Sequence, residues 1–88
     1  MSETHSLLEF PTDFPIKVMG HTIDGFADTV LEIVLKHAPD FDAASMTMTP
    51  SKHGKYISLT CTINATTQAQ LDDLYRELSG HPLVIMVL

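Results

Sequence analysis

Residues 45–64, SMTMTPSKHGKYISLTCTIN, decide the fold, because they contain two stretches in which apolar and polar side chains alternate. Methionine alternates with serine and threonine from 45 to 49, and from 56 to 64 every second side chain is apolar. A period of two is typical of a β-strand with one buried face. The stretch between them is polar and contains Gly54, as hairpin loops often do. The pattern therefore predicts a β-hairpin with one apolar face.

A helix is predicted on each side of this hairpin. The helix before it has one apolar stripe, formed by Ile23, Phe26, Ala27, Val30, Leu31 and Val34. Pro39 ends this helix close to Ala38. After the hairpin, Thr67 and Gln70 have the spacing of a capping box, and a second helix is predicted from Thr67 to Ser79.

A strand is predicted at each end of this arrangement. Residues 14–19 alternate up to Gly20, and residues 83–88, LVIMVL, are apolar and uncharged throughout. The resulting order is that of an α+β, ferredoxin-like β-α-β-β-α-β sandwich, in which two helices cover one face of a four-stranded antiparallel sheet. The first and third strands are expected in the centre of the sheet. We expect residues 13–88 to form a single domain, preceded by a flexible segment, residues 1–12, that becomes anchored at Phe10.

The charge of the chain argues against some classes of partner. The 88 residues include 5 Lys and Arg against 11 Asp and Glu, for a formal net charge of -6. Nucleic acid and anionic membranes attract a surplus of positive charge, so neither is an expected partner. The chain has no apolar run long enough to span a bilayer and no secretory signal at its start, so we expect a cytoplasmic protein.

The sequence contains no recognisable catalytic or metal-binding constellation. Cys61 belongs to the apolar series of its strand, where burial makes a thiol unreactive. The five histidines are scattered, without a pair at the spacing of metal ligands. Asp72 and Asp73 fall in the first turn of the second helix, where the helix dipole accounts for negative charge. We therefore expect no enzymatic activity, no metal and no cofactor.

The turn after the first strand is the best candidate for a small-ligand site. Backbone N–H groups at the start of a helix can bind an anionic group, and glycines allow it to approach. The candidate ligand-binding residues are Gly20, His21, Asp24 and Gly25. The alternative is a purely structural turn, which is favoured by the negative charge of Asp24.

The apolar last strand has two interpretations. It can be buried on both faces, by the helices on one side and by Leu7, Leu8 and Phe10 on the other. It can instead form an association surface for a protein partner or a second copy of the chain, since exposed apolar patches of this size are uncommon on monomers. If Leu83, Ile85 and Val87 face the helices, the candidate surface consists of Phe10, Val84, Met86 and Leu88.

An RNA-binding domain is the alternative from another functional class. RNA-recognition motifs share the predicted topology and use basic and aromatic residues of the open sheet face. The corresponding residues here are Lys17, Lys52, Lys55 and Tyr56. A single aromatic residue and the net charge of -6 weigh against this interpretation.

Several short segments resemble the YbeD-like family of small bacterial proteins of unknown function. They are Leu8-Glu9-Phe10-Pro11, Lys17-Val18-Met19-Gly20, Ile63-Asn64-Ala65-Thr66, the series Leu71, Leu74, Tyr75 and Leu78, and Met86-Val87-Leu88. The resemblance implies a ferredoxin-like fold similar to the ACT regulatory domains of amino-acid metabolism. ACT domains usually bind an effector beside the first strand-to-helix turn, and Gly25-Phe26-Ala27 is similar to the start of their first helix.

The leading hypothesis is a non-enzymatic, ACT-like regulatory module. It is expected to act by protein association or by binding a small metabolite.

Overall fold

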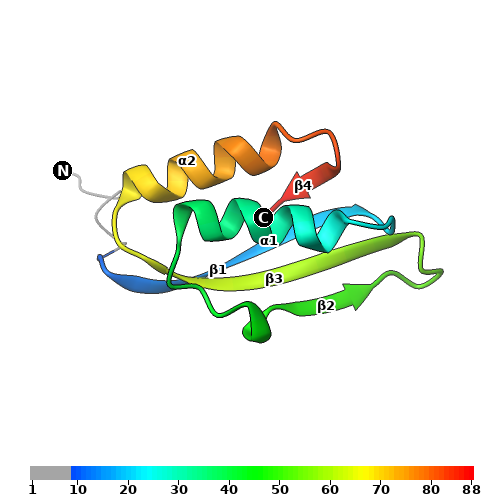
Figure 1. The fold of residues 1–88 in the computed structure, drawn as a ribbon, viewed down its shortest axis with the longest axis horizontal. Coiled ribbons are helices and arrows are strands. Elements are labelled where there is room, and N and C mark those ends of the chain that lie inside the picture. The colour runs from blue at the N-terminus through cyan, green and yellow to red at the C-terminus, as the bar shows by residue number, and fades with distance from the viewer. Residues whose placement is uncertain (1–8) are drawn as a thin grey trace.

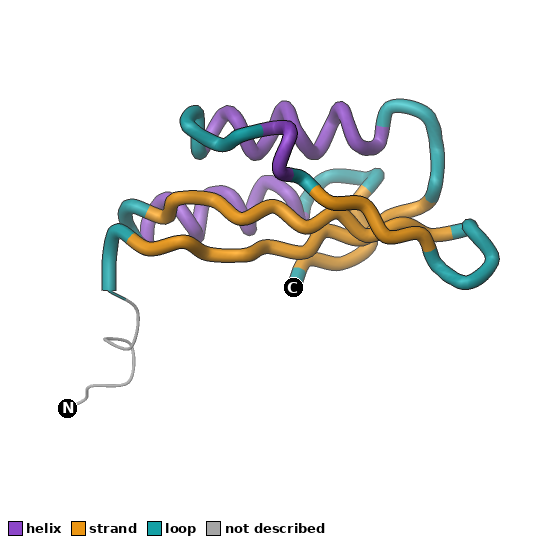
Figure 2. Tube along the Cα trace, turned by 90° about the horizontal axis from the view of Figure 1, so that it is seen from below, coloured by secondary structure: helices purple, strands orange, loops and turns teal. Residues whose placement is uncertain are grey.

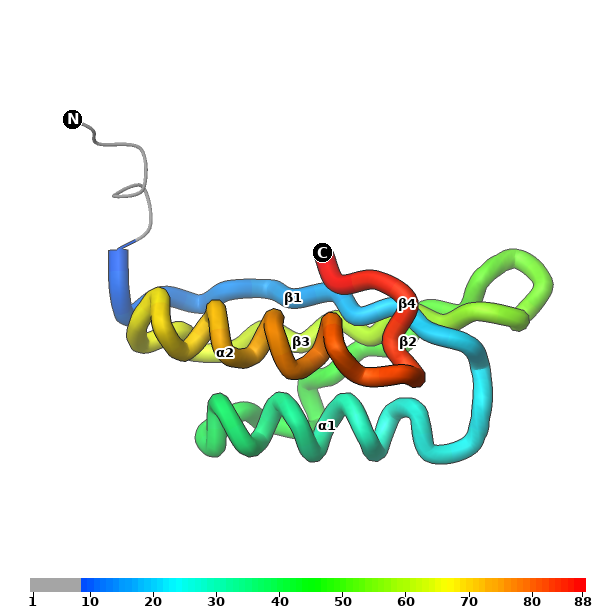
Figure 3. Tube along the Cα trace, turned by 90° about the horizontal axis from the view of Figure 1, so that it is seen from above, coloured from blue at the N-terminus to red at the C-terminus, as the bar shows by residue number. Residues whose placement is uncertain are grey.

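The computed structural model describes residues 9–88, which form a four-stranded antiparallel sheet and two helices. The elements are β1 (Thr12–His21), α1 (Phe26–His37), β2 (Thr47–Pro50), β3 (Tyr56–Ala65), α2 (Gln68–Ser79) and β4 (Val84–Val87). The strands lie in the order β2-β3-β1-β4. The two helices run side by side in opposite directions (Figures 1 and 3). The predicted ferredoxin-like sandwich is confirmed, with β1 and β3 in its centre.

The long pairing of β1 with β3 sets which side chains lie under the helices. These strands pair from Thr12 opposite Ala65 to His21 opposite Tyr56. Alternate side chains along each strand point to opposite faces of the sheet. One face therefore collects buried residues, which are Ile16 and Val18 from β1 and Leu59, Cys61, Ile63 and Ala65 from β3.

The helices cover this face with the apolar stripes that the sequence predicts. The buried helical residues are Phe26, Val30, Ile33 and Val34 of α1 and Leu71, Leu74 and Leu78 of α2. Burying each side chain of this size contributes about 1.5–3 kcal/mol. The core therefore lies between the helices and one face of the sheet, and no helix of residues 9–88 covers the other face.

The start of α2 agrees with the predicted capping box. The Thr67 hydroxyl accepts a hydrogen bond from the N–H of Gln70 at 3.1 Å. The Gln70 side chain accepts in return from the N–H of Thr66 at 2.6 Å, one residue earlier than the usual capping-box partner. Thr67 is thus the N-cap, and the helix itself begins at Gln68.

Ile23, the first residue of the predicted apolar stripe, is not part of α1. Gly25 has φ 86°, a left-handed conformation that interrupts the helix, and α1 begins at Phe26. Ile23 lies in the turn before it and is 49% exposed. Glycine adopts this φ without steric cost, which explains why the turn is placed here.

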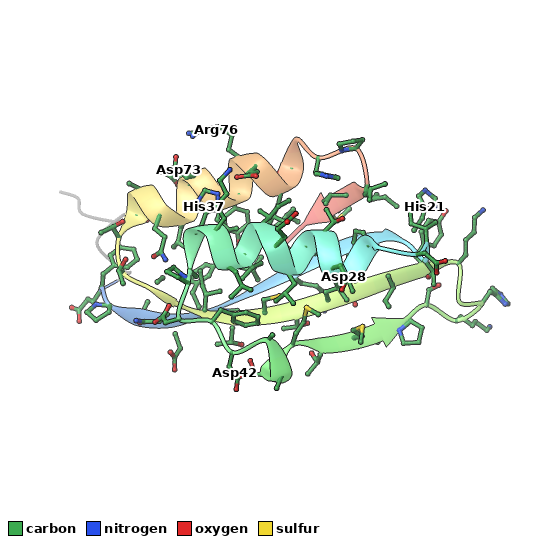
Figure 4. The ribbon with its side chains drawn as sticks, viewed as in Figure 1. His21, Asp28, His37, Asp42, Asp73 and Arg76 are labelled. Carbon is green, nitrogen blue, oxygen red and sulfur yellow. The ribbon has the colours of Figure 1, made fainter. Side chains whose placement is uncertain are left out.

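The second strand also starts later than predicted. Residues Ala43–Ser45 form a short 3-10 helix, and β2 begins at Thr47. Asp42 caps the 3-10 helix, because its carboxylate accepts a hydrogen bond from the N–H of Ala44 at 3.0 Å. Asp42 is labelled in Figure 4 beside this turn.

The chain joins the domain before the predicted first strand. β1 begins at Thr12, and the partly buried Phe10 packs against the core. Most of the segment predicted to be flexible, residues 1–12, lies outside the described residues, because these begin at residue 9. Leu7 and Leu8 are among the residues that are not described.

Candidate interaction surface

The sheet face without helices, called the open face below, carries hydroxyl, thioether and basic side chains. It is defined by register, since Lys17 and Met19 alternate with the buried Ile16 and Val18. Cross-strand partners share a face. The open face therefore includes Lys17, Met19 and His21 of β1, Tyr56, Ser58, Thr60 and Thr62 of β3, Thr47 and Thr49 of β2, and Met86 of β4.

A β-bulge turns the last strand in a way that strict alternation does not predict. Met86 lies opposite Met19, but Val84 lies opposite Gly20, so Ile85 is an extra residue. Val84 and Val87 both pack against the core. The expectation that Ile85 faces the helices and that Val84 lies on the association surface with Met86 is therefore wrong. Ile85 is 51% exposed.

Three apolar side chains meet on the open face beside β4. Leu88 pairs with Lys17, since the N–H of each donates to the carbonyl oxygen of the other, at 2.8 and 3.1 Å. Leu88 therefore neighbours the pair of Met19 and Met86 on the same face. Met86 is 48% and Leu88 60% exposed. We call Met19, Met86 and Leu88 the methionine patch.

Phe10 does not belong to this patch. It precedes the start of β1, whereas β4 pairs with Val18 to Gly20 near the opposite end of that strand. Phe10 therefore does not cover the last strand, and the structure does not bring it to Met86 and Leu88.

The hairpin end of the open face combines an aromatic ring with two basic side chains. The ring centroids of His21 and Tyr56 are 5.0 Å apart, and Lys55 Nζ is 5.6 Å from the centroid of Tyr56. A hydrogen bond of 2.9 Å from the N–H of Thr22 to the carbonyl oxygen of Lys55 joins the two turns at this end. The loop between β2 and β3, which carries Lys52, projects beyond the sheet (Figure 2).

A shallow depression of about 160 Å³ lies between the hairpin and the methionine patch. It is lined by Met19, Thr49, Pro50, Ser51, Tyr56, Ile57 and Ser58. This depression was not predicted from the sequence, because it forms only when the registers of three strands place Met19, Ser58 and Thr49 in one row. The alternation of β1 places Met19 on the open face, as expected from the sequence, but it does not show which side chains of β2 and β3 lie next to it.

The turn proposed as a ligand site is explained by its structure. A Cβ atom at Gly20 would overlap the Phe26 ring and the carbonyl oxygen of Leu83, so packing requires a glycine here. Gly25 supplies the left-handed φ, His21 contacts Tyr56, and Asp24 is exposed. No side chain of the described part of the chain caps the start of α1. Metabolite binding at this turn stays a prediction, and packing accounts for its first glycine.

The helices are acidic, and their basic residues are engaged in ion pairs. Glu77 of α2 contacts Lys36 of α1 at 3.2 Å and His37 at 2.7 Å. The hydrogen bonds from His37 and Lys36 lower the pKa of Glu77. Arg76 contacts Asp73 at 2.9 Å, on the outer side of α2 (Figure 4).

The described residues offer little for covalent or metal chemistry. Cys61 is fully buried, and burial raises the pKa of its thiol to about 11, so it is unreactive at neutral pH. Within residues 9–88, no group of three or more His, Cys, Asp and Glu side chains is placed to hold a metal ion. In the same part of the chain, no helix is both long and apolar enough to cross a membrane.

Comparison with known proteins identifies the family. A family model described as "Protein of unknown function (DUF493)" matches residues 5–88. The chain belongs to this family. Among curated DUF493 relatives, a UPF0250 protein of Bordetella pertussis is 57% identical over 83 residues, covering 94% of this chain and 91% of the relative. A UPF0250 protein of Nitrosomonas europaea is 53% identical over 83 residues, covering 94% and 95%. The resemblance to the YbeD-like family is thereby confirmed.

Solved structures show that this DUF493 protein has an ACT-like fold. The ACT domain from the GTP pyrophosphokinase of Chlorobium tepidum matches with a TM-score of 0.66 and 18% identity, covering 88% of this chain and 97% of that domain. The C-terminal domain of the MgtC protein from Mycobacterium tuberculosis matches with a TM-score of 0.68 and 20% identity, covering 93% and 89%. At these identities the likeness concerns the fold alone.

Proposed function

We propose that this chain is a non-catalytic regulatory module that binds a protein partner through one half of its open face. This half, called the hairpin half, is the one nearest the loop between β2 and β3 and extends over Lys17–His21 of β1 and Tyr56–Thr60 of β3. The observation that carries the proposal is the methionine patch, which leaves Met86 and Leu88 about half exposed on a face with no helix over it. Large exposed apolar groups in contact with one another are typical of interaction sites. Methionine suits such a site, because its flexible thioether adapts to a partner's shape.

The ACT-like fold supports the regulatory part of the proposal, by analogy of fold alone. The chemistry of the described residues supports a non-catalytic role, since the thiol of Cys61 is buried and protonated. The proposal also places the module in the cytoplasm, where a single cysteine stays reduced.

The face of the sheet is a better binding surface than its edges. β4 is short and bulged, and β2 is short and ends in Pro50. Short strands, bulges and prolines all hinder the addition of a further strand. The partner is therefore expected to contact side chains of the open face, rather than to extend the sheet beside β4.

The test compares two methionine variants that differ in the face they alter. Met86 is 48% exposed and lies on the open face. Met48 is 56% exposed, but it pairs with the buried Leu59 and so points to the helix side. The wild-type chain, Met86→Ser and Met48→Ser each serve as bait in a lysate of the source bacterium, and the recovered proteins are quantified by mass spectrometry.

A partner recovered with the wild-type chain and with Met48→Ser, but lost with Met86→Ser, is the expected result. Equal recovery by all three baits would show that the open face is not the binding surface. A monodisperse chain in light scattering that recovers no partner would also contradict the proposal.

A further inference from the structure

The charges of this protein differ between its helix layer and the open face of its sheet. This difference indicates what kind of partner the open face can bind. The acidic residues of the helices are Asp28, Glu32, Asp72, Asp73 and Glu77. Asp28 and Asp73 are labelled on the helix layer in Figure 4. On the open face, by contrast, the charged residue next to the methionine patch is Lys17, and Lys52 and Lys55 lie in the loop at the hairpin end. The net charge of -6 does not reveal this difference between the two layers.

The basic residues of the two layers also differ in their partners. Lys36 and Arg76 of the helices are neutralised by Glu77 and Asp73. Among the described residues, Lys17, Lys52 and Lys55 form no ion pair. The strand residue on the open face that carries a carboxylate is Asp13, which lies opposite Asn64 at the far end of β1 from the hairpin. The charged side chains that the strands and the loop place on the hairpin half of the open face are thus lysines, and no ion pair within residues 9–88 neutralises them.

The depression beside the methionine patch adds a place for an apolar anchor. Its lining includes Met19, Thr49, Tyr56 and Ser58 of the open face, together with Pro50 and Ile57, which pair with each other in the neighbouring row. Protein interfaces are usually dominated by a few apolar anchors that fill such hollows, with charges at the rim. Lys17 and Lys55 lie on either side of the row that contains Met19, and therefore occupy the rim.

We infer that the occupant of the open face is an acidic protein segment that inserts an apolar side chain into this depression and places carboxylates against Lys17 and Lys55. The inference rests on the proposed function and names the chemistry of the partner. Opposite charges accelerate association and exclude partners of the wrong sign.

A second copy of the chain fits the open face poorly. Pairing the hairpin halves of two open faces about a two-fold axis would set one group of unpaired lysines against a surface that carries the same group, without a neutralising carboxylate from the strands of either hairpin half. Docking the acidic helices of one copy on the open face of another would be a head-to-tail contact, which propagates into a filament unless it closes into a ring.

Single-stranded RNA also fits less well than an acidic segment. Bases stack on aromatic rings, and the open face offers Tyr56 as its large ring, already in contact with His21. The methionine patch beside it consists of the aliphatic Leu88 and the thioethers of Met19 and Met86, which favour apolar side chains.

The inference is tested by titrating the isotope-labelled chain and following its backbone amide shifts in nuclear magnetic resonance spectra. The first probe is a synthetic peptide in which glutamate alternates with leucine and phenylalanine. The second is the same peptide with lysine in place of glutamate, and the third is oligouridine. The charge-reversal variant Lys17→Glu is compared with Arg76→Glu, which makes the same charge change on the helix layer.

The acidic peptide is expected to shift the amides of Met19, Ser58, Thr60 and Met86, with an affinity that falls as salt is added. Lys17→Glu should weaken this binding by about tenfold, and Arg76→Glu should leave it within about twofold. Lys55→Glu provides a second test if Lys17→Glu does not fold.

The remaining outcomes separate the inference from the proposed function. Equal binding of the lysine peptide at the same amides would overturn the inference, because apolar contacts alone would then select the partner, and the proposed function would stand. Tighter binding of oligouridine at these amides would overturn both. Concentration-dependent self-association that Lys17→Glu strengthens would favour a second copy and overturn the inference. Absence of shifts with every probe would also contradict it.

Discussion

Gly20 illustrates how a single residue can suggest a ligand site and yet be explained by packing. In the sequence it stands at a strand-to-helix turn with a second glycine nearby, as an anion-binding loop would. In the structure its missing side chain makes room for the ring of Phe26 and the carbonyl oxygen of Leu83. The glycine therefore allows α1 and the start of β4 to approach β1 closely.

Replacement of Gly20 by alanine is expected to destabilise the fold by about 1–3 kcal/mol, the usual cost of overpacking a core. The clash involves a buried ring and a backbone atom, and neither can move away easily. Gly80→Ala is the matched control, since Gly80 has a right-handed conformation and its added Cβ would lie 3.2 Å from the Arg76 carbonyl oxygen. Its effect should be clearly smaller than that of Gly20→Ala, because its tightest contact is 3.2 Å rather than a direct overlap. Chemical denaturation measures both, and equal stabilities of the two variants would refute the packing role of Gly20.

The two helices are joined at one end by a polar contact around Glu77. Its carboxylate accepts hydrogen bonds from His37 at 2.7 Å and from Lys36 at 3.3 Å. Gln70 adds a hydrogen bond of 2.8 Å from its side-chain amide to the carbonyl oxygen of His37. These contacts align the end of α1 with α2, and they lower the pKa of Glu77 below its ordinary 4.5.

A lowered carboxylate pKa makes this part of the stability depend on pH. The ionised Glu77 stabilises the fold above the pKa of the unfolded chain, and this contribution is lost as the pH falls through the lower, folded-state pKa. Glu77→Gln should therefore melt at a lower temperature than the wild-type chain at neutral pH, and the difference should close in acid, below about pH 4.5. Thermal melts across this pH range measure the effect.

Glu32→Gln serves as the control, because Glu32 is an exposed carboxylate of α1 outside the ion pairs of the described chain. Its melting difference from the wild-type chain should change little with pH. A difference for Glu77→Gln that stays constant from neutral pH into acid would contradict the role assigned to the His37 and Lys36 contacts.

At the scale of elements, the sequence predicted what depends on periodicity and missed what depends on local backbone geometry. The helices and the long strands β1 and β3 follow from stripes and alternation, and Thr67 was correctly placed at the start of α2. The bulge at Ile85 was missed, since an entirely apolar strand does not reveal which residue is extra. The 3-10 helix at Ala43–Ser45 was missed because Ser45 and Met46 extend the alternating pattern of β2 toward the N-terminus.

At the scale of the whole molecule, the strand register brings together residues that are far apart in the sequence. The sequence placed Met86 and Leu88 on the association surface and Met19 on the open face. It did not predict that Met19 lies beside Met86, nor the depression next to it, because cross-strand neighbours follow from pairing rather than from order along the chain. Likewise, the net charge of -6 gave no indication that the charged side chains on the hairpin half of the open face are lysines.

The central claim is that this protein binds its partner through the open face, and site-specific photo-crosslinking in living cells tests it most directly. A photoreactive benzoylphenylalanine replaces either Thr60, which lies between Lys17 and Thr47 on the open face, or Glu32 on the exposed side of α1. The account predicts a discrete covalent adduct from position 60 and none from position 32. An adduct from position 32 alone, or equal adducts from both positions, would contradict it.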